Sequence, residues 1–60
     1  MFKLKQKRLA NNLTLREVAD YLNLTEQAVN HYEKGRRKPN FKILKALSKL
    51  YNCTIDELVD

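Results

Sequence analysis

With 60 residues, one Cys, one His and a net charge of +5, the chain has room for one domain at most. One Cys and one His exclude an internal disulfide and a metal site, and no segment has the pattern of a membrane span or a signal peptide. The hydrophobic fraction of 43%, with one Gly and one Pro, is enough for a compact core, so we expect a folded, soluble, cytoplasmic protein.

The first predicted element is a helix over residues 2–11. We expect it to end at Asn12, because asparagine tolerates the left-handed backbone conformation that closes a helix. Its apolar residues, Phe2, Leu4 and Leu9, are imperfectly spaced.

The second predicted helix, residues 15–22, has clear signals at both ends. Thr14 and Glu17 have the spacing of a capping box, in which each side chain satisfies a free backbone N–H of the first turn. Asn23 is able to adopt the positive φ that ends the helix. Apolar residues recur on one face at Leu15, Val18, Ala19 and Leu22.

The third predicted helix covers residues 26–34, with Thr25 as its cap and Gly35 as its left-handed end. It has few apolar residues, namely Ala28, Val29 and Tyr32. Its outward positions are polar: Glu26, Gln27, Asn30, His31 and Lys34.

Two further helices complete the chain. Asn40 is expected to cap a helix that carries Phe41, Leu44, Leu47 and Leu50 on one face, with Ile43 and Tyr51 at its margins, and that closes at Asn52. Thr54 and Glu57 have the spacing of a second capping box before a short helix with Ile55, Leu58 and Val59. No segment alternates with period two, so we predict no strand and an all-α bundle of five short helices in one domain, residues 1–60.

Positive charge is concentrated in the second half of the chain. Between residues 34 and 49 there is no acidic residue, whereas residues 50–60 contain no basic one. The basic residues of the first stretch are Lys34, Arg36, Arg37, Lys38, Lys42, Lys45 and Lys49. Such a strip favours a polyanionic partner, and a solubilising surface is the alternative.

The second and third predicted helices, with the turn 23–25 between them, have the arrangement of a helix-turn-helix. Ala19 is small where the helices cross, Asn23 makes the turn tight, and Val29 is the buried contact back to the second helix. The polar face of the third helix then suits the edges of base pairs, because Asn and Gln pair bidentately with adenine.

At these residues the chain resembles the phage-repressor and Cro-type (Xre family) helix-turn-helix domains. The matching residues are Leu4, Arg8, Leu13, Thr14, Glu17, Val18, Ala19, Leu22, Asn23, Leu24, Thr25, Val29, Glu33, Lys34, Gly35, Pro39, Leu44, Leu47, Leu50, Cys53, Thr54 and Leu58. The resemblance implies a lambda-repressor-like fold with residues 26–34 as a recognition helix in the major groove. It also implies an interior ion pair between Arg8 and Glu33.

We therefore expect a bacterial or phage-encoded transcriptional regulator, a repressor by preference, that binds double-stranded DNA sequence-specifically as a homodimer on a palindromic operator. The candidate base contacts are Glu26, Gln27, Asn30 and His31. For Glu26, complementing the helix dipole is an equally weighted alternative to accepting from a cytosine.

The expected contacts to the DNA backbone come from residues that border the third helix. They are Arg16, Thr25, Lys34, Arg36, Arg37, Lys38 and Asn40. Two features depart from the family pattern. Leu15 stands where relatives often have a phosphate-binding Gln, so that contact is lost or supplied by Arg16 or another neighbour. Asparagine replaces the usual glycine at positions 12, 23 and 52, which leaves the fold intact.

The alternative function is a protein-interaction module, such as an antitoxin component. A patch of apolar residues expected to be exposed would serve it, or would form a homodimer seam instead: Tyr21, Ile43, Tyr51, Ile55 and Val59. The chain could also be the N-terminal part of a longer regulator. We predict no enzymatic activity, cofactor, small-molecule substrate or membrane partner, and we expect Cys53 to be a small buried hydrophobe.

Overall fold

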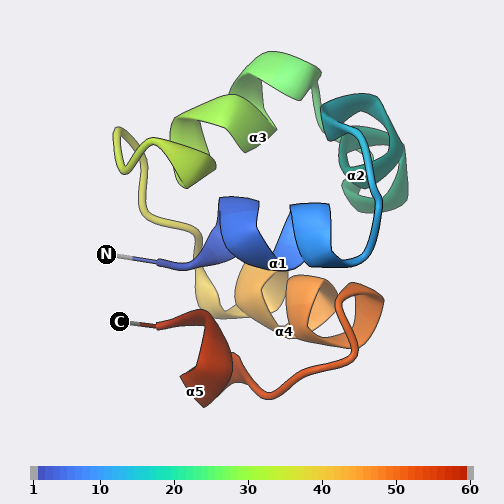
Figure 1. Cartoon of the computed structure of the whole chain (residues 1–60). Helices are drawn as coiled ribbons and strands as arrows, with labels where there is room; N and C mark the ends of the chain where they lie inside the picture. The colour runs from blue at the N-terminus through green and yellow to red at the C-terminus, as the bar shows by residue number, and fades with distance from the viewer. Residues whose placement is uncertain (1, 60) are drawn as a thin grey trace.

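The computed structural model describes residues 2–59, and these residues form five helices joined by short loops (Figure 1). In chain order they are α1 (Leu4–Ala10), α2 (Leu15–Leu22), α3 (Glu26–Glu33), α4 (Phe41–Leu50) and α5 (Ile55–Leu58). Helix α1 runs through the middle, with α3 on one side of it and α4 and α5 on the other (Figure 1). The radius of gyration is 9.9 Å, close to the roughly 10 Å of a compact chain of this length. The predicted all-α fold is confirmed.

Side chains cap the start of every helix except α1. The hydroxyl oxygens of Thr14, Thr25 and Thr54 and the amide oxygen of Asn40 each accept a backbone N–H three residues later, at 2.8–3.2 Å. Only Thr14 forms a complete capping box, in which its own N–H donates to Glu17 Oε1 at 2.9 Å. These bonds satisfy amides that the first turn of a helix leaves free.

Left-handed residues end four of the helices, as their sequence signals predicted. The backbone φ is 57° at Asn12, 58° at Asn23, 77° at Gly35 and 52° at Asn52. In each case the next residue donates its N–H to a carbonyl five positions back, which is the long bond of a Schellman motif. These bonds are Leu13 to Arg8, Leu24 to Ala19, Arg36 to His31 and Cys53 to Ser48, at 2.9–3.1 Å.

All five helices contribute to one hydrophobic core. Its buried members are Leu4, Val18, Ala19, Val29, Tyr32, Leu47, Tyr51 and Leu58. Arg8 is buried among them as well. Because each helix is short, none has a core of its own, and the bundle depends on this shared cluster.

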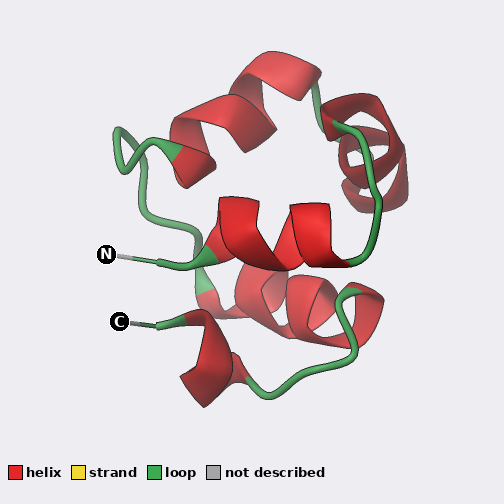
Figure 2. Ribbon diagram, in the orientation of Figure 1, coloured by secondary structure: helices red, strands yellow, loops and turns green. Residues whose placement is uncertain are grey.

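The predicted helix over residues 2–11 begins two residues later than expected. Phe2 instead pairs with Val59 in an isolated antiparallel bridge, the only β pairing among residues 2–59. For these residues Figure 2 shows helices and loops and no strand. The Lys3 N–H donates to the Leu58 carbonyl at 2.7 Å, so the two ends of the chain lie side by side. No local signal in the sequence could reveal this contact, because it joins opposite ends of the chain.

Three other predictions were wrong, each because of a specific neighbour. Phe41 is 68% exposed, since it shares a helix side with Lys45 rather than with the core-facing Leu47. Tyr51 was placed in an exposed patch but is 3% exposed, because it follows Leu47 by four residues on the buried side. The second capping box is half formed, because the Glu57 carboxylate lies 3.7 Å from Lys7 Nζ instead of closing it.

The buried hydroxyl of Tyr51 has no hydrogen-bond partner among residues 2–59. An unpaired buried polar group costs about 1–3 kcal/mol, so Tyr51→Phe should leave the free energy of unfolding unchanged or raise it near neutral pH. Burial and, secondarily, the Glu33 carboxylate raise the pKa of Tyr51 above its ordinary value of 10.0. As the pH rises through the ordinary pKa, the unfolded chain loses this proton while the folded chain keeps it, so the wild type loses stability there.

The advantage of Tyr51→Phe should therefore grow between about pH 8 and about pH 11. Urea denaturation of both proteins across that range measures it. The other two tyrosines are common to both proteins, so the difference isolates Tyr51. A variant that is less stable than the wild type at every pH would contradict the assignment.

Candidate nucleic-acid interface

A buried ion pair holds the C-terminal end of α3 against α1. Arg8 donates from Nε to Glu33 Oε2 at 2.7 Å and from Nη2 to Oε1 at 3.3 Å. Its Nη1 donates to the Leu13 carbonyl at 2.9 Å. The side chains of Arg8 and Glu33 are only 10% and 4% exposed. The structure therefore contains the pair that the family resemblance implied, with two parallel hydrogen bonds that restrict its geometry.

Helices α2 and α3 cross at small buried side chains, as a helix-turn-helix requires. Ala19 of α2 and Val29 of α3 are both buried, and Asn23 has the left-handed conformation at the turn. Leu24 packs against the core from within that turn. Because Val29 and Tyr32 fill the inner side of α3, its polar residues remain on the outer side.

The four candidate base contacts lie on that outer side of α3. Glu26 and Gln27 are exposed in its first turn, while Asn30 and His31 are half-buried further along. None of these side chains hydrogen-bonds to another residue within 2–59, so their donors and acceptors are free for a partner. Glu26, as an acid in the first turn, also complements the helix dipole.

The candidate backbone contacts come from α2, from the loop after α3 and from the residues that cap α3 and α4. The cationic side chains of Arg16, Lys34, Arg36, Arg37 and Lys38 are all exposed. Thr25 and Asn40 use an oxygen atom to cap α3 and α4, which leaves the hydroxyl hydrogen and the side-chain NH₂ as donors.

Leu15, at the position where the family often has glutamine, is half-buried and packs against the core. The exposed neighbour in the same turn is Arg16. At this position the departure from the family pattern therefore adds a partly buried apolar side chain to the core.

Arg37 has a contact that the sequence reasoning missed. Its Cζ lies 5.7 Å from the centroid of the Tyr32 ring. The backbone N–H groups of Arg36 and Arg37 both donate to the His31 carbonyl, at 3.0 and 3.3 Å. The sequence pattern indicated Tyr32 only as one of the apolar residues of the third helix, although its position three residues before Gly35 and five before Arg37 could have indicated the contact across the turn.

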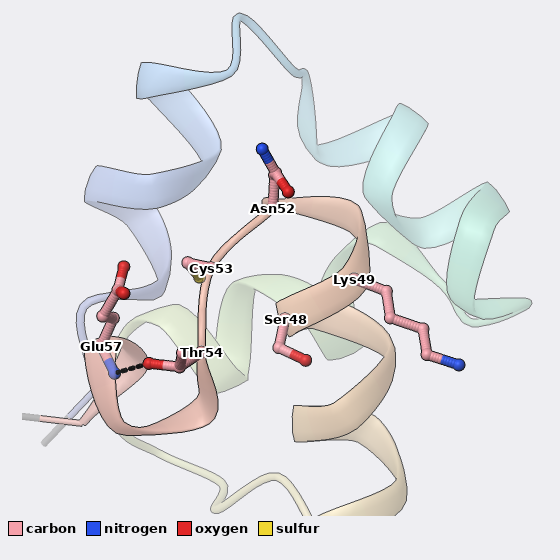
Figure 3. A pocket seen from close by; sticks show the side chains of 6 residues that line it. All are labelled: Ser48, Lys49, Asn52, Cys53, Thr54 and Glu57. Carbon is pink, nitrogen blue, oxygen red and sulfur yellow. Dashed lines mark hydrogen bonds between the residues drawn. The ribbon is translucent and has the colours of Figure 1, made fainter.

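A shallow hollow of about 400 Å³ lies elsewhere, between the end of α4 and α5 (Figure 3). It is lined by Ser48, Lys49, Asn52, Cys53, Thr54 and Glu57, none of which belongs to the predicted interface. Cys53 is half-buried, in partial agreement with its prediction as a buried hydrophobe, and burial raises the pKa of its thiol. The thiol thus stays protonated and is a weak nucleophile at neutral pH.

Within residues 2–59, no group of three or more His, Cys, Asp or Glu side chains is placed to hold a metal ion. In the same range, every helix is too short and too polar to cross a lipid bilayer.

Comparison with known proteins decides the family. The sequence pattern of a family described as helix-turn-helix matches residues 4–58. The chain belongs to this helix-turn-helix family. The match covers the whole bundle from α1 to α5, which confirms the resemblance to Cro-type (Xre family) domains.

Two curated relatives share this helix-turn-helix. The chain is 40% identical over 57 residues to the "HTH-type transcriptional activator BcrR" of Enterococcus faecalis, covering 95% of this chain and 28% of the relative. It is 36% identical over 56 residues to the "Uncharacterized HTH-type transcriptional regulator YqaE" of Bacillus subtilis (strain 168), covering 93% and 48%. The chain thus spans less than half the length of either relative.

Breaking the buried pair should destabilise the helix-turn-helix strongly. Glu33→Gln leaves the Arg8 guanidinium buried without its counter-charge, which costs about 3–5 kcal/mol. Lys7→Ala is the matched control, because it removes the exposed pair with Glu57, and exposed pairs contribute about 0.2–1 kcal/mol. Thermal and urea unfolding measure both variants, and equal losses would refute a special role for the buried pair.

Proposed function

We propose that this chain binds double-stranded DNA sequence-specifically, with α3 in the major groove, and regulates transcription. The observation that carries this proposal is the uncovered polar face of α3 with exposed cations beside it, from Lys34 to Lys38. Membership of the helix-turn-helix family and the names of both relatives support it.

The chemistry of that face suits duplex DNA in two ways. The major groove is about 12 Å wide and admits an α-helix, and there Gln27 and Asn30 can each pair bidentately with an adenine. The cations of the loop after α3, with the free donors of Thr25 and Asn40, would contact phosphates, which gives affinity and register without sequence information.

We further propose that the regulator represses by occupying promoter DNA. One relative is named an activator. Whether a bound regulator represses or activates depends on where its binding site lies relative to the promoter. A reporter with the selected site placed across or upstream of the promoter measures which effect occurs.

A selection from random duplexes should recover two inverted half-sites about one helical turn, roughly 34–36 Å, apart. This spacing is the one expected if two copies bind a palindrome symmetrically. Light scattering of the chain with the selected duplex gives the number of copies bound. Recovery of a single half-site with one copy bound would contradict the dimer.

Replacing a reading side chain should change specificity, whereas replacing a loop cation should change affinity. Gln27→Ala and Asn30→Ala should each relax the preference at one base position, at a cost of about 1–3 kcal/mol on the selected site. Arg37→Ala should weaken binding to all sequences and reduce the salt slope of log K by about 0.9.

Fluorescence anisotropy with selected and scrambled duplexes at several salt concentrations separates these effects. If the selected site were the same for Gln27→Ala, Asn30→Ala and the wild type, the reading face would be assigned wrongly. If the wild type bound no duplex at low salt, the proposed function itself would fail.

A further inference from the structure

The cations that follow α3 differ in how firmly they are held. Arg36, Arg37 and Lys38 are all exposed, and charge alone would make them equivalent. Among residues 2–59, however, Arg37 is the one cation whose charged group lies over an aromatic ring. The backbone N–H groups of Arg36 and Arg37 both donate to the His31 carbonyl, so the contact with the ring is what distinguishes Arg37 from Arg36.

We infer that Tyr32 is a positioning residue for DNA binding: its ring holds the Arg37 guanidinium beside α3 before the duplex arrives. This inference rests on the proposed function, since it concerns how one contact to the phosphate backbone is prepared. Tyr32 does not touch the DNA; it acts through Arg37.

The Tyr32 side chain contacts both the hydrophobic core and Arg37. The side chain is buried in the hydrophobic core, so the orientation of its ring is set by the same packing that places α3. Arg37 lies over that ring on the solvent side. The position of the guanidinium is therefore coupled to the position of the recognition helix.

The contact with the ring leaves the donors of Arg37 available. The attraction of the cation to the ring is electrostatic and uses none of the guanidinium N–H groups as hydrogen-bond donors. No hydrogen bond joins the Arg37 side chain to any of residues 2–59. The planar fork thus remains free to bind a phosphate, with less side-chain entropy to lose on binding than a free side chain.

Lysine cannot replace arginine in this arrangement. An ammonium group is a compact, strongly hydrated charge without a flat face, so it stacks less well and binds phosphate through single contacts. Arg37→Lys keeps the charge but loses the prepared geometry. Arg36→Lys makes the same chemical change at the adjacent position, where no ring lies beneath the side chain, and is the matched control.

Binding to the selected duplex separates geometry from charge. Arg37→Lys should weaken binding about 3- to 10-fold more than Arg36→Lys, because both changes remove a bidentate donor but only the first also removes the contact with the ring. Both variants should keep the salt slope of the wild type, because the number of neutralised phosphates is unchanged. In Tyr32→Phe, which keeps a ring in the core, affinity should stay within about 2-fold of the wild type.

The contact also has a readout that does not need DNA. In the NMR spectrum of the free chain, the ring should shift the side-chain Hδ and Hε signals of Arg37 away from those of Arg36. In a folded Tyr32→Leu variant that difference should vanish, and Arg37→Lys should then weaken duplex binding no more than Arg36→Lys does. If Tyr32→Leu does not fold, the comparison of the two lysine variants decides.

Equal losses of affinity for Arg37→Lys and Arg36→Lys would overturn the inference and leave the proposed function standing. A wild type that binds no duplex would overturn both. A wild type that binds, with ring-shifted Arg37 signals and a larger loss for Arg37→Lys than for Arg36→Lys, would support the inference.

Discussion

The buried pair of Arg8 and Glu33 is the constraint on which the rest of this small bundle depends. Its hydrogen bonds join three separate parts of the chain, because Arg8 donates both to Glu33 at the end of α3 and to the Leu13 carbonyl in the turn after α1. Burying two charges is expensive, and the arrangement is tolerable only because the guanidinium finds acceptors on both sides. The pair fixes the position of the last turn of α3. This turn contains Tyr32 and leads into the loop with Arg36, Arg37 and Lys38.

Hydrogen bonds at the helix ends stabilise the individual helices, since helices of 4 to 10 residues are unstable on their own. Four side-chain caps and four left-handed ends satisfy backbone groups that would otherwise be exposed at the many helix termini. Three of those ends are asparagines, which pay a small conformational penalty that glycine would avoid. The short segments between helices therefore each have one backbone conformation. In the turn between α2 and α3, this conformation sets the angle at which the two helices cross.

The sequence predicted the parts of the structure whose causes are local. Caps, left-handed ends and the buried Ala19 and Val29 follow from residues a few positions apart, so the helices and the turn before α3 were found nearly in full. The errors arose where the cause lies far along the chain. Phe2 pairs with Val59, and the Glu57 carboxylate forms an ion pair with Lys7 instead of accepting the Thr54 N–H to complete the capping box. The outward placement of the polar residues of α3 follows from the same helix pattern, whereas the contact of Arg37 with the Tyr32 ring depends on how the turn folds back.

At Thr25 and Asn40, the residue that caps a helix also supplies donors to the surface that we propose meets phosphate. Each exposed side chain uses its oxygen to accept a helix N–H, and each keeps donor hydrogens for a partner. Aspartate would cap α4 as well as Asn40 does, but it would place a negative charge beside the surface that we propose meets phosphate. A threonine or asparagine cap thus stabilises the helix and keeps the rim of the interface rich in donors.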